Sequence, residues 1–167
     1  MTELTAVLDT KLTRNLPLLA PQSALNQDVY DYIIELERSA YAGDIELSYS
    51  SRLAVATDNS IYQQLPQAVL HPKSTEDLSV LAAVANKWPK VSFSARGGGT
   101  GTNGQSLTPG IVVDTSRYMN KILEHNIAEG WVRVQSGVIK DALNDFLRPF
   151  GYFFSPDLST SNRATIG

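Results

Sequence analysis

The first regular pattern of apolar positions spans residues 25–41, where hydrophobic side chains recur at steps of three and four. This spacing places them on one face of an α-helix, with acidic residues between them on the other faces. The apolar face consists of Leu25, Val29, Tyr32, Ile33 and Leu36. We expect an amphipathic helix that stops by Gly43. Residues 44–67 have mixed polarity and a local turn signal, so they predict a connecting segment without a regular element.

A strand followed by a helix is predicted from residue 68 onward. Residues 68–72 form a short apolar run that is typical of a buried strand. Ser74 followed by Asp77 resembles the capping arrangement that starts a helix. The apolar face of this helix consists of Leu78, Leu81, Ala82, Ala85 and Trp88. Pro89 ends the predicted helix because proline cannot continue it.

Two more strands complete this first part of the predicted fold. Residues 91–95 place Val91, Phe93 and Ala95 in alternation with polar residues, as in a half-buried strand, and residues 110–114 form another apolar run. Strand, helix, strand units usually join parallel strands of one sheet by a right-handed crossover. The pattern therefore predicts a small α/β lobe.

The pattern of apolar and polar positions changes after this lobe. Residues 121–126 and 131–136 are two short strand candidates with hairpin-like spacing, and we expect them to pair antiparallel. A helix follows Gly137 and ends at Gly151. Its wide apolar stripe consists of Ile139, Ala142, Leu143, Phe146, Leu147 and Phe150. These elements predict a second lobe that begins near residue 118.

A dense glycine loop follows the strand at residues 91–95. Its glycines are Gly97, Gly98, Gly99, Gly101 and Gly104. Glycine permits positive φ and lets backbone N–H groups approach a ligand, and successive N–H groups form a site for an anion such as pyrophosphate. Arg96 adds positive charge, and side-chain hydrogen bonds can come from Thr100, Thr102 and Asn103. We predict a cradle for the pyrophosphate of a bound cofactor.

Part of this loop also matches the G-x-G-x-x-G spacing of Rossmann dinucleotide-binding domains, at Gly99, Gly101 and Gly104. A Rossmann loop opens directly into a helix, whereas residues 105–109 lead within a few positions into another strand. A P-loop is excluded because no Lys-Ser or Lys-Thr pair follows the last glycine. The cradle therefore belongs to neither of these nucleotide-binding folds.

Composition narrows the class of protein. The chain has 167 residues, 43% of them hydrophobic, which suits one compact domain or two small lobes. Its formal net charge of -3 offers no positive field that would gather nucleic acid. Cysteine is absent from these residues, and the N-terminal residues 1–23 contain no apolar run long enough for a signal peptide or a membrane span. We expect a soluble, cytoplasmic protein.

From residue 67 onward the chain resembles the FAD-linked oxidase family, the PCMH-type or vanillyl-alcohol-oxidase-like flavoproteins. The similarity lies in an ordered series of five blocks: AVLHPKSTEDLSVLAAVA, SARGGGTGTNGQ, GIVVDTSRYMNKI, WVRVQSGVIKDALNDFLRPFGYFF and SPDLSTSNRATIG. The resemblance implies an α+β fold in which two small α/β subdomains clamp FAD. It divides the chain into a helical lead-in and connecting segment (1–66), a first FAD-binding subdomain (67–117) and an incomplete second one (118–167).

The resemblance also assigns cofactor-binding residues. Residues 97–104 would wrap the FAD pyrophosphate. A second FAD-contacting segment would include Pro156, Ser161, Ala164, Thr165 and Gly167. Family members that attach flavin covalently often carry a histidine in the glycine loop, and none occurs at residues 100–103, so noncovalent FAD is expected. His71 and His125 lack partner motifs and are interpreted as structural residues.

A long subgroup of the family, similar to D-2-hydroxyglutarate and D-lactate dehydrogenases, joins this domain to a C-terminal iron–sulfur region. The resemblance to it implies an FAD-dependent oxidoreductase of 2-hydroxyacids, with a 4Fe-4S cluster outside these residues. Two alternatives stay open: a flavoenzyme like the UDP-sugar enolpyruvyl reductases, and a noncatalytic nucleotide-binding module. The sequence leaves the electron acceptor, the oligomeric state and the particular hydroxyacid open.

The chain ends at Gly167, in the middle of the family's second FAD segment. We therefore expect a truncated second subdomain, with the substrate domain and the catalytic residues downstream. No catalytic acid or base is assigned among these residues. The 167-residue chain by itself is expected to bind FAD weakly or not at all and to be inactive.

Overall fold

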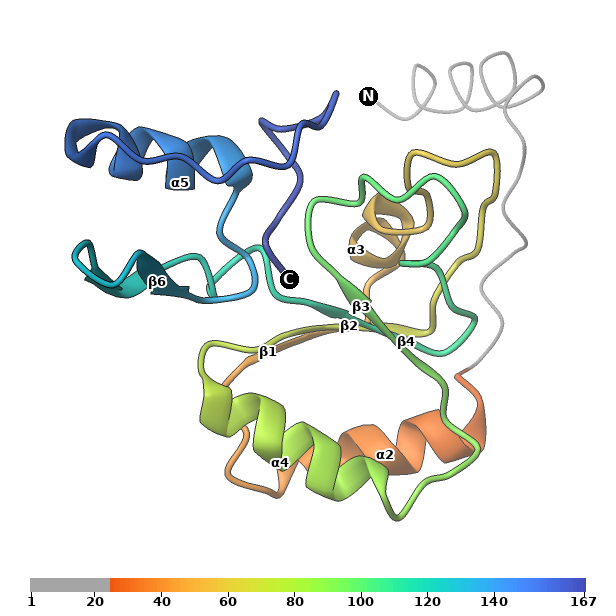
Figure 1. Ribbon diagram of the computed structural model, residues 1–167. Coiled ribbons are helices and arrows are strands. Elements are labelled where there is room, and N and C mark those ends of the chain that lie inside the picture. The colour runs from red at the N-terminus through yellow and green to blue at the C-terminus, as the bar shows by residue number, and fades with distance from the viewer. Residues whose placement is uncertain (1–24) are drawn as a thin grey trace, which may run out of the picture.

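The computed structural model describes residues 25–167, which fold into two lobes (Figure 1). The elements of lobe 1 are α2 (Gln27–Glu37), β1 (Asp44–Glu46), α3 (Tyr49–Ala54), β2 (Ala68–His71), α4 (Thr75–Ala85), β3 (Phe93–Arg96) and β4 (Ile111–Asp114). Lobe 2 contains β5 (Ile122–Asn126), β6 (Trp131–Val134), α5 (Lys140–Leu147) and the 3-10 helix η2 (Arg148–Phe150). Residues 115–120 connect the lobes and are called the linker below.

Lobe 1 is built on a four-stranded sheet in the order β1-β2-β4-β3. Strand β4 lies between β2 and β3 and pairs with both in parallel, whereas β1 pairs with β2 antiparallel at the edge. The strand, helix, strand unit β2-α4-β3 was predicted, and β4 was expected beside it. The structure adds that β4 inserts between the two strands of that unit.

Both faces of the central strands are covered (Figure 1). Helices α2 and α4 lie side by side on one face, and α3 lies on the other. Leu70 and Ile111 belong to the core under α2 and α4, whereas Val69 and Val112 cluster with Val55 on the opposite face. Successive side chains of a strand point to opposite faces, so strands buried on both sides read as continuous apolar runs. This explains the sequences of β2 and β4.

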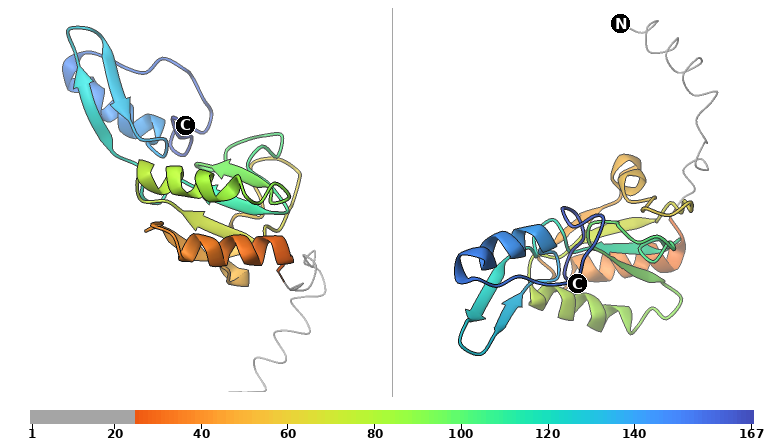
Figure 2. Two further views of the ribbon diagram at one scale, coloured as in Figure 1. Left: turned by 90° about the horizontal axis from the view of Figure 1, so that it is seen from below. Right: turned by 45° about the horizontal axis from the view of Figure 1, so that its top comes forward.

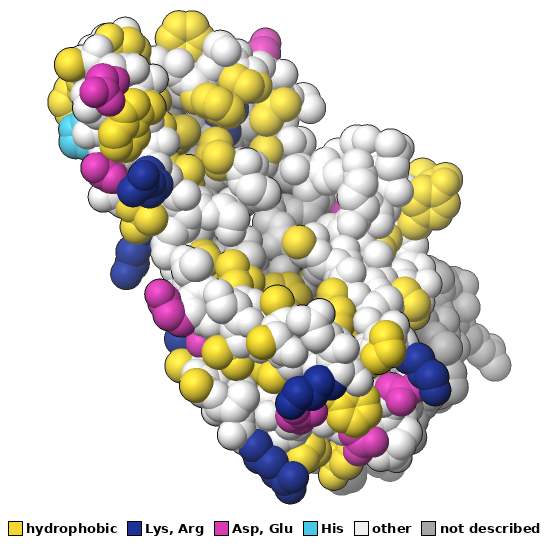
Figure 3. Space-filling model, turned by 60° about the horizontal axis from the view of Figure 1, so that its bottom comes forward, with side chains coloured by type: hydrophobic (Ala, Val, Ile, Leu, Met, Phe, Trp, Pro, Cys, Tyr) yellow, Lys and Arg dark blue, Asp and Glu magenta, His cyan; other side chains and the backbone are white. Residues whose placement is uncertain are grey.

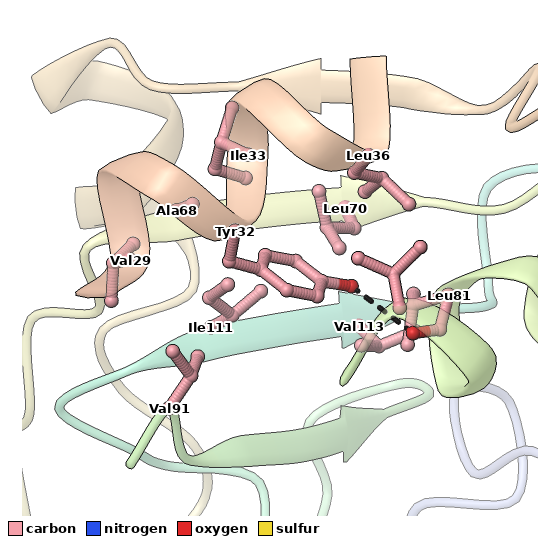
Figure 4. Packing of buried hydrophobic residues seen from close by; sticks show 11 residues of the cluster. Val29, Tyr32, Ile33, Leu36, Ala68, Leu70, Leu81, Val91, Ile111 and Val113 are labelled. Carbon is pink, nitrogen blue, oxygen red and sulfur yellow. Dashed lines mark hydrogen bonds between the residues drawn. The ribbon is translucent and has the colours of Figure 1, made fainter. Parts of the chain in front are cut away.

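Tyr32 stands at the centre of the larger core (Figure 4). Its side chain is fully buried, and its hydroxyl donates a hydrogen bond to the carbonyl oxygen of Leu81 on α4 at 3.4 Å. Its ring meets that of Phe93 on β3 edge to face, with 5.1 Å between the ring centroids. Burial raises the pKa of the Tyr32 hydroxyl. One residue of α2 thus contacts both α4 and the sheet.

Lobe 2 is smaller and projects from lobe 1 (Figure 2). Strands β5 and β6 form an antiparallel hairpin, as predicted, and α5 packs on it through the buried residues Leu143 and Leu147. Val138, just before the helix, belongs to the same buried cluster. Gly151 follows η2 with φ 77°, a left-handed conformation that favours glycine. Hydrophobic side chains also gather on the surface of this lobe (Figure 3), among them Phe150, Tyr152 and Phe153.

Local sequence signals located several element ends correctly. Ser74 caps α4 by accepting a hydrogen bond from the backbone N–H of Asp77 at 3.1 Å, as the capping pattern predicted. The predicted face of α4 was wrong in one position, because Ala82 is exposed and Val84 is buried instead. Ala95 of β3 was predicted on the half-buried face and is exposed as well.

Two predictions about the first third of the chain were wrong. Helix α2 ends at Glu37 rather than near Gly43, and the Ser39 hydroxyl hydrogen-bonds to the carbonyl oxygen of Leu36 at 2.6 Å in the turn that follows. The segment 44–67 contains β1 and α3 instead of lacking regular elements. A three-residue edge strand is defined by its distant partner, which no local pattern reveals.

The subdomain boundaries at residues 66 and 117 stay predictions. Helix α2 and strand β1 pack into the same lobe as the predicted first subdomain. The prediction about the N-terminal residues 1–23 lies outside the described residues.

Candidate functional site

A cavity of about 760 Å³ lies between the two lobes. Its lining comprises Ala54, Val55, Arg96, Gly97, Gly98, Asp114, Ser116, Asn120, Gly137, Ile139, Ala142, Arg163 and Thr165. Residues of both lobes and of the linker contribute, so the cavity depends on how the lobes are held together. Its volume falls within the range of about 300–1,000 Å³ that is usual for small-molecule and cofactor sites.

The ends of two parallel strands place charged side chains in the lining of this cavity. Strand β3 ends at Arg96 and β4 at Asp114, and these two residues are register partners. The glycine loop continues from the first strand end and the linker from the second. Ligands of open parallel sheets bind outside the carboxyl ends of the strands, where loops diverge. The cavity occupies that position.

Arg96 is held in place by a short series of hydrogen bonds. Its guanidinium donates to the carbonyl oxygen of Val55 at 3.4 Å and to the hydroxyl of Ser106 at 3.2 Å. The Ser106 hydroxyl in turn donates to Asp58 Oδ2 at 3.4 Å. Burial lowers the pKa of Arg96, and the carboxylates of Asp114 and Asp58 oppose this effect. An arginine side chain stays protonated in proteins, so a fixed positive charge faces the cavity.

The glycine loop packs directly on the C-terminal segment, defined here as residues 160–167. A Cβ on Gly97 would lie 3.0 Å from Cβ of Thr165 and would overlap its hydroxyl. A Cβ on Gly98 would overlap the carbonyl oxygen of Arg163. Gly99 has φ 64°, a left-handed conformation that is strained for a residue with a side chain. The missing side chains at Gly97 and Gly98 therefore let the glycine loop pack closely on the C-terminal segment. The ligand approach that the sequence predicted stays a prediction.

The C-terminal segment also completes the start of α5. The residue before this helix, Ile139, has no side chain that caps it. Instead, the backbone N–H of Lys140 donates to the carbonyl oxygen of Ala164 at 3.0 Å, and that of Asp141 to the carbonyl oxygen of Ser161 at 3.2 Å. The first amides of a helix need such external acceptors. The segment therefore occupies the N-terminus of α5 with its own carbonyl groups.

The predicted site residues divide into three groups. Arg96, Gly97, Gly98 and Thr165 line the large cavity. Gly99 and Thr100, together with Arg96, line an adjacent polar pocket of about 210 Å³. The remaining predicted residues are Gly101, Thr102, Asn103, Gly104, Pro156, Ser161, Ala164 and Gly167, and they line neither cavity. Which of these residues contact FAD stays a prediction.

Two charged residues of the lining were missed by the sequence reasoning. Asp114 ends a buried strand, and a carboxylate in that position is itself a signal for a site at the sheet edge. Arg163 lies in the C-terminal segment and lines both pockets. Its guanidinium donates to the carbonyl oxygen of Gly98 at 3.4 Å and has no carboxylate partner within salt-bridge range among residues 25–167.

The linker contributes uncharged groups that the sequence reasoning also missed, namely Ser116 and Asn120. Gly137, at the start of lobe 2, also lines the cavity. It packs directly on the linker, because a Cβ at this position would overlap the carbonyl oxygen of Thr115. No pattern within the linker marked these residues, because only the approach of the two lobes brings them to one cavity.

Neither histidine lines the cavity. His71 is buried behind the strand end, with its Nδ1 3.8 Å from Asp114 Oδ2. His125 packs against the rings of Phe146 and Phe150, at centroid distances of 5.3 Å and 5.2 Å.

Residues 25–167 offer neither a metal-binding cluster nor a membrane-spanning helix. No group of three or more His, Cys, Asp or Glu residues in this part of the chain is placed to hold a metal ion. No helix of the same part is long and apolar enough to cross a membrane.

Comparison with known proteins gives consistent matches. The chain is 53% identical over 154 residues to D-2-hydroxyglutarate dehydrogenase of Escherichia coli (strain K12), which covers 91% of this chain and 15% of that protein. It is 54% identical over 154 residues to D-2-hydroxyglutarate dehydrogenase of Haemophilus influenzae, again covering 91% of this chain and 15% of the relative. The chain thus spans about 15% of the length of these curated relatives.

A solved structure has a similar fold. The chain superposes on alkyldihydroxyacetonephosphate synthase with a TM-score of 0.73 and 20% sequence identity, covering 92% of this chain and 32% of that one. At that identity the likeness concerns the fold alone. Residues 66–167, more than half of the chain, match the family described as FAD binding domain. The chain therefore belongs to the FAD binding domain family, with the PCMH-type fold.

Proposed function

We propose that this chain is the FAD-holding part of a flavin-dependent dehydrogenase that oxidises a 2-hydroxyacid, of which D-2-hydroxyglutarate is the leading candidate. The observation that carries the proposal is the interlobe cavity, where the glycine loop faces Arg163 and Thr165 in a chain of the FAD binding domain family. The substrate class rests on the names of relatives that are 53% and 54% identical over 91% of the chain.

The residues present fit a dinucleotide cofactor at one end of the cavity. A pyrophosphate requires positive charge and converging N–H donors. Arg96 and Arg163 supply two guanidinium groups there, and the backbone of Gly97 and Gly98 lines the same cavity. We assign the pyrophosphate to this end of the cavity.

The rest of the lining fits the other parts of such a cofactor. Val55, Ile139 and Ala142 offer apolar surface for a flat ring. The Asp114 carboxylate and the Asn120 amide suit hydroxyl groups of a sugar rather than phosphate, because a carboxylate only accepts hydrogen bonds when it is ionised. The cavity therefore combines the three kinds of lining that a noncovalent FAD requires.

When bound, FAD supplies the acceptor for the hydride equivalent that leaves the hydroxyacid. The residues of this chain bind and orient the cofactor and hold positive charge beside it, and none of them is assigned a proton-transfer step. The resemblance places substrate-binding residues, catalytic residues and an iron–sulfur electron acceptor in the remaining length of the relatives. A cytoplasmic location belongs to the same proposal.

The proposal is tested on a protein that carries this chain within the full length of its relatives. We expect a purified protein with the absorbance of bound flavin and dye reduction with D-2-hydroxyglutarate in preference to its L-enantiomer. Arg96→Gln should weaken FAD binding roughly 10- to 100-fold, because a hydrogen bond to a charged group contributes about 1.5–3 kcal/mol.

Arg38→Gln is the matched control, because Arg38 is exposed on the surface after α2, far from the cavity lining. It should leave flavin content unchanged. A folded wild-type protein that neither contains flavin nor takes it up would refute the proposed function. Flavin reduction by NADPH but by no hydroxyacid would refute the substrate class alone.

A further inference from the structure

The linker is hydrogen-bonded to both lobes. The backbone N–H of Thr115 donates to the carbonyl oxygen of Arg96 in lobe 1 at 3.0 Å. The carbonyl oxygen of Met119 accepts from the backbone N–H of Gly137 in lobe 2 at 2.7 Å. Ser116 and Asn120 of the same linker line the cavity. The position of this short segment therefore determines part of the cavity wall.

Tyr118 fastens the linker to the far edge of the sheet in lobe 1. Its hydroxyl donates a hydrogen bond to Asp44 Oδ2 on β1 at 2.6 Å. Lys73 Nζ and Arg117 Cζ lie 5.2 Å and 5.3 Å from the centroid of its ring, within the range of cation–π contacts. Tyr118 does not line the cavity, although two of its neighbours on the linker do. It thus holds the linker from outside the cavity.

Asp44 is the acceptor on which these contacts converge. Its Oδ1 also accepts from Lys73 Nζ at 2.6 Å, and Arg117 Nη1 lies 3.7 Å from its Oδ2. Hydrogen bonds from Lys73 and Tyr118 lower the pKa of Asp44, and the bond to Asp44 raises the pKa of Tyr118. Both shifts favour an ionised carboxylate and a protonated hydroxyl. Asp44 belongs to the edge strand that the sequence pattern did not reveal.

We propose that Asp44 and Tyr118 are positioning residues that fix the linker and, through it, the spacing of the two lobes around the cofactor cavity. The effect on FAD rests on the proposed function, whereas the effect on lobe spacing does not. The contacts of Tyr118 and Asp44 are called the clamp below. A separate contact between the lobes, the packing of the C-terminal segment on the glycine loop, involves neither residue of the clamp. Loss of the clamp should therefore loosen the cavity without unfolding either lobe.

The lobe spacing is measured first, on the 167-residue chain. The sequence contains no cysteine, so Ala83→Cys on α4 and Ala128→Cys in the hairpin turn provide unique, exposed sites for two spin labels. Pulsed electron paramagnetic resonance then measures the distance between the two spin labels, one on α4 and one on the hairpin. We expect Tyr118→Phe to broaden this distance distribution while circular dichroism stays unchanged. An unchanged distribution in a folded Tyr118→Phe variant would overturn the proposal.

Two further variants separate the parts of the clamp. Tyr30→Phe is the matched control, because Tyr30 is 49% exposed on α2 and its hydroxyl makes no hydrogen bond to the described residues. It should leave the distribution as it is. Asp44→Asn keeps an acceptor for Tyr118 but loses the charge that pairs with Lys73, so it should broaden the distribution less than Tyr118→Phe.

Cofactor affinity is measured second, in a protein with the full length of the relatives. Tyr118→Phe should weaken FAD binding roughly tenfold, corresponding to the net contribution of one charge-assisted hydrogen bond. Tyr30→Phe should not change it. Broadened lobe spacing with unaltered FAD affinity would refute the cofactor part of the inference. Absence of FAD binding in the wild type would instead refute the proposed function, and the distance measurement would still decide on the clamp.

Discussion

Gly98→Ala tests whether the contact between the glycine loop and the C-terminal segment couples the two lobes. A Cβ at this position would overlap the carbonyl oxygen of Arg163 and lie 2.7 Å from its carbonyl carbon, whereas real Cβ contacts stay above 3.0 Å. The group in the way is therefore the backbone carbonyl of Arg163. It belongs to a turn in which the backbone N–H of Ala164 donates a hydrogen bond to the carbonyl oxygen of Thr160 at 2.8 Å. The segment must therefore move as a unit.

The size of the effect follows from overpacking. An inserted methyl group that forces backbone shifts costs typically about 1–3 kcal/mol. For a chain of this size, each kcal/mol lowers the melting temperature by roughly 2–4 °C, so the expected decrease is roughly 2–12 °C. Lobe 2 should be the part affected, because its core contains only three buried hydrophobic residues among those described and the C-terminal segment completes its helix.

Tryptophan fluorescence can observe each lobe separately. The sequence contains two tryptophans, Trp88 after α4 in lobe 1 and Trp131 on β6 in lobe 2. With Trp88→Phe as background, the thermal transition of Trp131 reports lobe 2. We expect Gly98→Ala to lower this transition more than the transition of Trp88 in a Trp131→Phe background. The two transitions should then lie farther apart than they do in the parent chain.

Gly101→Ala is the matched control from the same loop. Its Cβ would lie 2.6 Å from Oε1 of Gln105, the far end of a flexible side chain that can move aside. It should change the melting temperature by no more than about 2 °C, which corresponds to roughly 0.5 kcal/mol. Equal losses in Gly98→Ala and Gly101→Ala, or an unchanged Trp131 transition in Gly98→Ala, would refute the reasoning.

Two further predictions concern stability. Leu143→Ala removes a side chain that is 1% exposed, so it should destabilise lobe 2 by about 2–5 kcal/mol in urea melts followed by Trp131; an unchanged midpoint would contradict the assigned core. Hydrogen bonds from Lys87 and Trp88 lower the pKa of Glu35, so its stabilising effect is complete above its ordinary pKa of 4.5 and disappears as the pH falls through the lowered value. Glu35→Gln should flatten the loss of stability below about pH 4.5, and an equally steep loss would argue against this role.

The features that short-range patterns determine were predicted well. The cap at Ser74, the β5–β6 hairpin and the stop at Gly151 each depend on residues a few positions apart. The glycine loop followed by a strand was enough to reject a Rossmann site, and the structure agrees, because β4 and not a helix comes next. The ordered sequence blocks from residue 67 onward were also enough to identify the family.

Features that depend on distant partners required the folded chain. Strand β1 exists because Asp44 to Glu46 pair with β2, and its polar residues carry no strand pattern of their own. Arg163 and Asp114 lie 49 positions apart in the sequence and meet at one cavity only when the lobes close on each other. The sequence by itself predicted a glycine cradle for pyrophosphate in a chain of the FAD binding domain family. The tertiary structure decided that Gly97 and Gly98 form a packing surface for the C-terminal segment, because the side chain of Thr165 and the carbonyl of Arg163 lie where their side chains would have been.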